Sequence, residues 1–274
     1  MSVAPEREPV RTPRVIGHRG SSEDAPEHTL AAYRKAIEDG ADGVECDVRL
    51  TRDGHLVCVH DRRIDRTSNG RGVLSTLELA DLTELDWGSW RDTWEDYEDP
   101  EVPDRDRAEI LTLRRLLEMV ASAGRRVEVA IETKHPTRYA GLVERRLVEL
   151  LDEFGWRHPR LGQRSPVRVM SFSQLSLRRI HSLAPSVETV FLMDRVPLRF
   201  RDGSLPPRVR VAGPSIEVIR AHPRYVERLH RRGNQAHVYT VDDDADVARC
   251  LAAGVDAIIT NRPAHVLAAV KRRS

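Results

Sequence analysis

The chain has 274 residues, of which 40% are hydrophobic and 32% are charged, and its formal net charge is +1. These proportions are typical of a globular protein with a large core. Basic residues are scattered among acidic ones and form no stripe, so nucleic acid is not an expected partner. No stretch approaches the roughly 18 consecutive apolar residues of a membrane span. The composition does not indicate an oligomeric state.

The N-terminus and the cysteines bear on where the protein works. Residues 1–13 are charged and proline-rich and have no apolar run, so we expect a flexible tail rather than a secretory signal. Cys46, Cys58 and Cys250 lie in apolar stretches, without the spacing of a zinc site or the density of a disulfide scaffold. We interpret them as buried thiols and predict a cytoplasmic protein.

Strand-like and helix-like segments alternate along the chain. Residues 15–17 read as a strand, and a helix with Thr29 as N-cap and an apolar stripe of Leu30, Tyr33 and Ile37 ends at Gly40. Strands are then expected at 44–48, 126–134, 168–170, 189–193, 209–212, 236–240 and 256–260, with helices between them. About eight such units close an α/β barrel, so we predict a TIM (β/α)8 barrel over residues 14–270 as a single domain.

Two carboxylates stand one residue apart in the strand at 44–48. Glu45 and Asp47 therefore share one face, which points into the barrel, while the alternate apolar residues face the helices. Adjacent inward carboxylates repel each other and lose hydration, so the pair favours a bound cation. Glu132 and Lys134 likewise share a face at the end of the strand at 126–134, where barrels carry their chemistry.

Asp53-Gly54 predicts a hairpin after the carboxylate strand. As a two-residue type I′ turn it pairs Arg52 with His55 and brings His60 directly opposite Asp47, with Cβ atoms about 4.5–5.5 Å apart. A one-residue bulge would cancel this register. On the two-residue register, we expect Gly54→Val to lower activity more than stability.

Residues 61–107 lose the alternation and are interpreted as an insertion after the second strand region. Trp87, Trp90, Trp94 and Tyr97 recur there at helical spacing. They form either a stripe packed on the barrel or a substrate lid.

At this point the chain resembles the glycerophosphodiester phosphodiesterase family, and the matching motifs run in order nearly from end to end. They are His18-Arg19-Gly20, Pro26-Glu27-His28-Thr29, Glu45-Cys46-Asp47, 51–54, His60-Asp61, Ile131-Glu132-Thr133-Lys134 and 254–263. His28 stands where the family usually has Asn, Tyr239 where Trp is common, and Asn261 where Asp is common. None of these departures removes a metal ligand or an acid–base histidine of the family.

The resemblance implies a TIM barrel with an inserted segment and a metal site of Glu45, Asp47 and Glu132. Three carboxylates without a thiolate suit one divalent hard cation, Mg²⁺ or Ca²⁺, with Mn²⁺ also acceptable. His18 and His60 correspond to the family's acid–base pair, and imidazole suits that task at neutral pH.

Three further residues are assigned more loosely. Arg19 and Lys134 would neutralise the phosphate oxygens. Glu27 is either the partner of Arg19 or an acid at the start of a helix. His28, His135 and His237 have no such support and remain unassigned.

The implied reaction is hydrolysis of a small-molecule glycerophosphodiester to sn-glycerol 3-phosphate and an alcohol. Two nucleophiles are open: water, or the neighbouring glycerol hydroxyl, which would form a cyclic phosphate first. Two other functions are weighed. A lysophospholipase D would take a lysophospholipid and use the aromatics between Trp87 and Tyr97, and a non-catalytic phosphate-binding barrel is disfavoured by the complete set of site residues.

Overall fold

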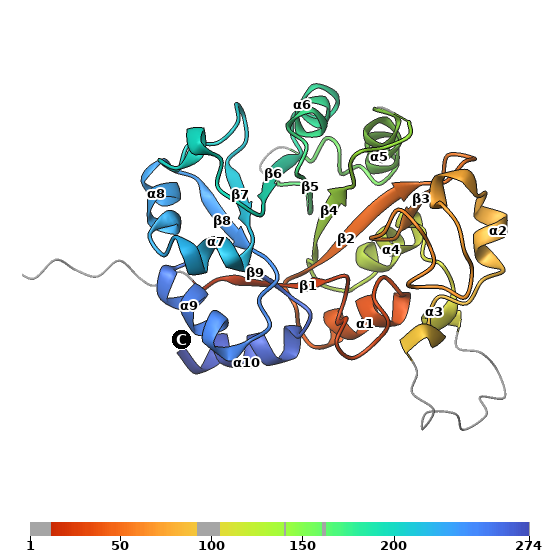
Figure 1. Cartoon of the computed structure of the whole chain (residues 1–274), viewed down its shortest axis with the longest axis horizontal. Coiled ribbons are helices and arrows are strands. Elements are labelled where there is room, and N and C mark those ends of the chain that lie inside the picture. Colours follow the sequence, from red (N-terminus) through yellow and green to blue (C-terminus); the bar gives the residue numbers. More distant parts are fainter. Residues whose placement is uncertain (1–11, 92–104, 140, 161–162, 274) are drawn as a thin grey trace, which may run out of the picture.

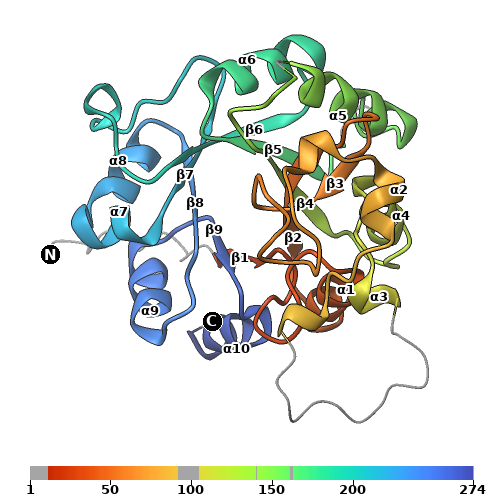
Figure 2. The same cartoon turned by 45° about the vertical axis from the view of Figure 1, so that its right-hand side comes forward.

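The computed structural model describes residues 12–91, 105–139, 141–160 and 163–273. In this part of the chain, eight parallel strands form a closed ring, because β1 pairs with both β2 and β9. The ring, seen in Figure 2, confirms the predicted TIM barrel. Its strands are β1 (Arg14–His18), β2 (Gly43–Leu50), β4 (Glu128–Thr133), β5 (Val167–Ser171), β6 (Glu188–Met193), β7 (Val211–Pro214), β8 (Gln235–Val238) and β9 (Ala257–Thr260).

Helices surround the ring on its outside (Figure 1). The longer ones are α1 (Leu30–Glu38), α4 (Leu113–Ala121), α5 (Leu142–Glu153), α6 (Gln174–Leu183), α7 (Ile216–Ala221), α8 (Tyr225–Arg231), α9 (Asp244–Ala253) and α10 (Pro263–Arg273). As predicted, Thr29 caps α1, since its hydroxyl accepts the backbone N–H of Ala32 at 3.2 Å. None of the helices in the described ranges is long and apolar enough to cross a membrane.

The two faces of β2 behave as its alternation predicts. Val44, Cys46 and Val48 are fully buried in the core between the sheet and the helices. Glu45 and Asp47 occupy the alternate positions, which face the barrel interior, and are 2% and 0% exposed. The predicted apolar positions thus hold the strand against α1 and the shared apolar core, and this packing fixes the direction of both carboxylates.

The hairpin after β2 differs from the two-residue prediction. β3 (Leu56–Cys58) pairs antiparallel with β2 so that Val48 faces Cys58, and the Val59 N–H donates to the Asp47 carbonyl at 3.1 Å. Asp47 therefore lies opposite Val59 and not His60. The loop has three residues between Thr51 and His55, and among them only Gly54 has positive φ, at 90°. The predicted register was wrong by one residue.

The segment after β3 forms the predicted insertion. It contains η1 (Leu74–Thr76), α2 (Leu79–Thr83), η2 (Ser89–Arg91) and α3 (Arg105–Ala108), and packs on β3 through its own apolar cluster. Trp87 is buried in that cluster, as a packed stripe requires, whereas Trp90 is 39% exposed. Trp94, Tyr97 and residues 1–11 of the tail predicted at 1–13 lie outside the described residues.

Candidate active site

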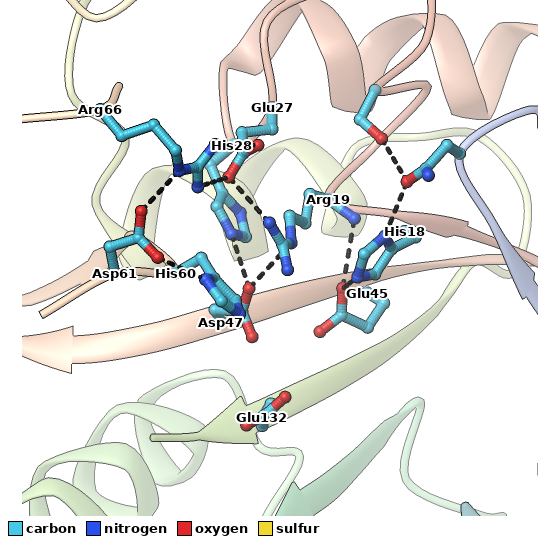
Figure 3. A network of polar contacts seen from close by, with 12 residues as sticks. His18, Arg19, Glu27, His28, Glu45, Asp47, His60, Asp61, Arg66 and Glu132 are labelled. Atoms are coloured by element: carbon cyan, nitrogen blue, oxygen red, sulfur yellow. Dashed lines mark hydrogen bonds and ion pairs between the residues drawn. The ribbon is translucent and has the colours of Figure 1, made fainter. Parts of the chain in front are cut away.

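Strand register brings the predicted site residues together at the carboxyl ends of β1, β2 and β4. In the parallel pairs His18 lies beside Glu45, and Asp47 lies beside Glu132. Neighbouring Cα atoms in parallel strands carry side chains on the same face. Four residues from three strands therefore project into one region, which Figure 3 shows together with His60.

Glu45, Asp47 and Glu132 form an acidic cluster. One carboxylate oxygen of each lies within 4.8 Å of the others, and all three residues are buried. Burial, followed by the charge of Asp47, raises the pKa of Glu45 well above its usual range and that of Glu132 to about 7. Crowded, poorly hydrated carboxylates gain most from a cation, and an all-oxygen donor set suits a hard divalent one. The cluster could therefore hold a metal ion, as the sequence predicts.

Asp47 is contacted by three basic side chains. Its carboxylate lies 2.8 Å from Lys134 Nζ, 3.1 Å from Arg19 Nε and 3.0 Å from His28 Nε2. Burial opposes its ionisation, but the His28 hydrogen bond and the charges of Lys134 and Arg19 outweigh burial and hold the pKa of Asp47 well below its usual range. Lys134 also pairs with Glu132 at 2.8 Å. Asp47 is thus ionised and held from three sides.

Arg19 begins a chain of ion pairs along the rim of the site (Figure 3). Its guanidinium contacts Glu27 at 2.9 Å, and Glu27 also accepts from Arg66 at 2.7 Å. Arg66 in turn pairs with Asp61, whose carboxylate lies 2.7 Å from His60 Nδ1. Burial opposes ionisation of Glu27, but the hydrogen bond from Arg66 and the charge of Arg19 lower its pKa to about 2. Glu27 is therefore the partner of Arg19, which was one of the two predicted alternatives.

Each of the two candidate catalytic histidines has one ring nitrogen held by an oxygen. His18 Nδ1 lies 2.7 Å from Asn261 Oδ1, and His60 Nδ1 lies 2.7 Å from the Asp61 carboxylate. Asn261 is itself oriented, because its amide N–H donates to Asp242 at 2.7 Å. An acceptor at Nδ1 fixes the proton there, so the neutral rings present Nε2 as a free acceptor. His18 Nε2 lies 3.9 Å from Glu45.

His28 is a site residue that the sequence left unassigned. It is 6% exposed, and besides Asp47 it contacts the Tyr33 hydroxyl at 2.8 Å. Tyr33 in turn donates to the Glu45 carbonyl at 3.2 Å. The sequence signal for His28 was its place next to Glu27 in the Pro26-Glu27-His28-Thr29 motif. The sequence marked Asn261 only as a difference from the usual family residue. Asn261 directly follows β9 and contacts His18 at the end of β1, and this contact forms only when the barrel closes.

The other two unassigned histidines lie away from the acidic cluster. His237 is 2% exposed, and its Nε2 lies 3.1 Å from Arg14 near the start of β1, at the opposite end of the barrel. His135 follows β4 and pairs with Glu144 of α5 at 3.3 Å. Neither contacts Glu45, Asp47 or Glu132.

A closed parallel barrel with an acidic cluster and two oriented histidines at the carboxyl ends of its strands defines a class, that of TIM-barrel enzymes with a candidate metal site. The family model described as "Glycerophosphoryl diester phosphodiesterase family" matches residues 18–265. The chain belongs to this family. This confirms the resemblance and the prediction of a phosphodiesterase enzyme.

Individual relatives match most of the chain. A Mycobacterium tuberculosis protein named "Probable glycerophosphodiester phosphodiesterase 1" is 45% identical over 258 residues, which cover 93% of this chain and 92% of the relative. A Bacillus subtilis "Glycerophosphodiester phosphodiesterase" is 33% identical over 255 residues, covering 90% and 83%.

Solved structures share the fold. The crystal structure of a glycerophosphodiester phosphodiesterase from Agrobacterium tumefaciens is 26% identical, with a TM-score of 0.74 and coverage of 93% of this chain and 99% of the other. A phosphodiesterase of Oleispira antarctica, solved with the product sn-glycerol-3-phosphate, is 24% identical, with a TM-score of 0.78 and coverage of 95% and 97%. The second likeness bears on the fold alone.

Proposed function

We propose that this enzyme is a metal-dependent phosphodiesterase that hydrolyses a glycerophosphodiester to sn-glycerol 3-phosphate and an alcohol. One observation carries the proposal: the buried cluster of Glu45, Asp47 and Glu132 lies with two histidines whose Nδ1 atoms are both held. Family membership and the names of the relatives support the substrate class. The proposal takes residues 14–270 as one domain that carries the whole site, and keeps the predicted cytoplasmic location.

The two histidines move the protons of the reaction. Each offers Nε2, because Asn261 or Asp61 occupies its Nδ1. One ring, in its neutral form, accepts a proton at Nε2 from the attacking water or glycerol hydroxyl. The other ring, in its protonated form, gives the proton on its Nε2 to the oxygen of the departing alcohol. These two roles require two histidine rings near the phosphorus. The register of β1 against β2 places one of them, His18, beside Glu45.

Charge on the phosphate is balanced by cations already in place. The acidic cluster would hold one divalent ion, Mg²⁺, Ca²⁺ or Mn²⁺, which polarises a phosphoryl oxygen when bound. Arg19 and Lys134 line the same region, and each keeps N–H groups beyond its contacts with Asp47. They bind the remaining non-bridging oxygens as negative charge develops there.

The test is an assay of the chelated protein with each metal. We expect release of sn-glycerol 3-phosphate from glycerophosphocholine or glycerophosphoinositol only after metal is restored, and loss of both metal binding and activity in Asp47→Ala and Glu132→Ala. His18→Ala and His60→Ala should bind metal but lose about 10²- to 10⁴-fold in kcat. Full activity of chelated Asp47→Ala would overturn the metal mechanism. Hydrolysis of lysophospholipid alone would select the lysophospholipase D function.

A further inference from the structure

A cavity of about 420 Å³ is lined in part by Lys134, which pairs with two carboxylates of the acidic cluster. Its wall comes from the end of β2, the segment after β3, the loop after β4 and the start of α5, and these elements lie together on the right of Figure 2. The volume is that of a pocket for a small organic molecule. The chain therefore has room for a substrate group beyond the phosphate.

Two wall residues are shared with the active site. Lys134 lines the cavity and pairs with both Asp47 and Glu132 at 2.8 Å. Arg49 lines it as well, and its Nε and Nη2 donate to the His60 carbonyl at 2.9 and 2.7 Å. A phosphodiester bound at the acidic cluster can therefore place one of its two alcohol groups in the cavity.

The wall carries three guanidinium groups that lack a carboxylate partner in the part of the chain that the structure describes. Arg49, Arg62, Arg138 and Lys134 line the cavity, and no carboxylate does so among the described residues. Among the described residues, no carboxylate pairs with the guanidinium group of Arg49, Arg62 or Arg138. Within the same part of the chain, the recorded hydrogen-bond partner of the Arg49 guanidinium is the His60 carbonyl. Arg138 stacks on the ring of Tyr139 at 5.7 Å.

Neighbouring arginines behave differently. Arg52 pairs with Glu78 at 2.7 Å, and Arg63 pairs with Asp65 at 2.9 Å. Both side chains lie outside the cavity wall. Unlike these two side chains, the guanidinium groups of the cavity wall have no recorded carboxylate partner among the described residues, and such groups bind phosphate and carboxylate by paired hydrogen bonds.

We propose that this cavity binds the alcohol portion of the substrate and selects an alcohol that carries a second anionic group, a phosphate or a carboxylate. The inference rests on the proposed function, because it assumes that a phosphodiester lies at the acidic cluster. Hydroxyl groups of Ser75, Thr76 and Thr137 also line the wall and suit a polyol ring or chain.

The test compares substrates that differ only in the charge of the alcohol. We expect kcat/KM for glycerophosphoinositol 4-phosphate to exceed that for glycerophosphoinositol about tenfold. In the same way, kcat/KM for glycerophosphoserine should exceed that for glycerophosphoethanolamine, which lacks the carboxylate. Arg62→Gln and Arg138→Gln should each reduce these ratios about three- to tenfold. Arg224→Gln, an exposed arginine before α8, removes the same charge elsewhere and should leave the ratios unchanged.

A second readout separates this inference from the proposed function. Inositol 4-phosphate, the alcohol released, should bind more tightly than inositol in calorimetry, and Arg62→Gln should weaken that binding. If no diester is cleaved but this binding pattern holds, the proposed function fails and the anion site stands. Equal kcat/KM for charged and neutral alcohols, or ratios that both arginine variants leave intact, overturns the inference.

Discussion

At the scale of single residues, Asp47 shows how the chain keeps a fully buried carboxylate ionised. An isolated buried charge is costly, and partners with good geometry are needed to offset its lost hydration. Arg19, His28 and Lys134 supply those partners from three separate segments. The orientation of Asp47 is consequently fixed before any ligand binds.

We expect His28→Ala to weaken metal binding about 10- to 100-fold, because the Asp47 carboxylate loses the N–H that orients it. Calorimetric titration of the chelated protein with Mn²⁺ measures this without reference to turnover. His28→Asn, the residue usual in the family, retains an N–H donor but a shorter one, and should fall between wild type and His28→Ala. Unchanged Mn²⁺ affinity in a folded His28→Ala protein would assign His28 to packing alone.

At the scale of elements, the β2–β3 hairpin shows what a sequence pattern can and cannot predict. Asp53-Gly54 indicated the turn correctly, but not its length, which depends on backbone angles. The three-residue loop needs positive φ at Gly54 alone, whereas the two-residue turn also demands it of Asp53. Thr51 closes the loop, since its hydroxyl accepts the His55 N–H at 2.9 Å. Nothing in the spacing distinguishes the two solutions.

His60 reaches the site although the register that placed it was wrong. β3 ends at Cys58, so strand alternation no longer decides where His60 points. Its position comes from contacts beyond the strand, with Asp61 at its ring and Arg49 at its carbonyl. The sequence thus supplied the residue but not the contacts that hold it.

Gly54→Val should lower the free energy of unfolding by about 1–2 kcal/mol, because a β-branched residue is strained at a φ of 90°. The same substitution should change kcat/KM of the folded enzyme little, since Asp47 and His60 are held by other side chains. Urea unfolding and steady-state assays measure the two effects. Gly54→Asn, which tolerates positive φ, is the control and should be nearly neutral. A clear fall in kcat/KM with little change in the free energy of unfolding would show that the turn itself positions the site.

At the scale of the whole molecule, the two ends of the barrel divide chemistry from stability. The alternation of strands and helices was enough to predict the closed ring and the face on which Glu45 and Asp47 lie. An ion cluster lies at the end of the barrel opposite the active site. No sequence pattern predicted it, because its members come from different strands. Glu128 of β4 accepts from Arg14 of β1 at 2.7 Å and also from Arg168 of β5. Barrel closure alone brings them together.

Glu128→Gln should lower the free energy of unfolding by about 2–4 kcal/mol, since the largely buried Arg14 loses its carboxylate partner and the largely buried Arg168 is left with Glu188. For a protein of this size, we expect Tm to fall by about 5–10 °C. Glu149→Gln is the matched control, because Glu149 is an exposed partner of Arg146 on α5 and should cost under about 1 kcal/mol. Values of kcat and KM measured below Tm should be those of wild type.

The pH dependence of this loss identifies its cause. Burial opposes ionisation of Glu128, but the hydrogen bond from Arg168 and the charges of Arg168 and Arg14 outweigh burial and lower its pKa from 4.5. A carboxylate with a lowered folded-state pKa contributes its full stabilisation above 4.5 and loses it as the pH falls through the folded value. The difference in unfolding free energy between wild type and Glu128→Gln should therefore be constant from pH 7 to about 5 and shrink below 4.5. A difference independent of pH down to acid unfolding would mean that Glu128 stabilises the barrel by packing and not by its charge.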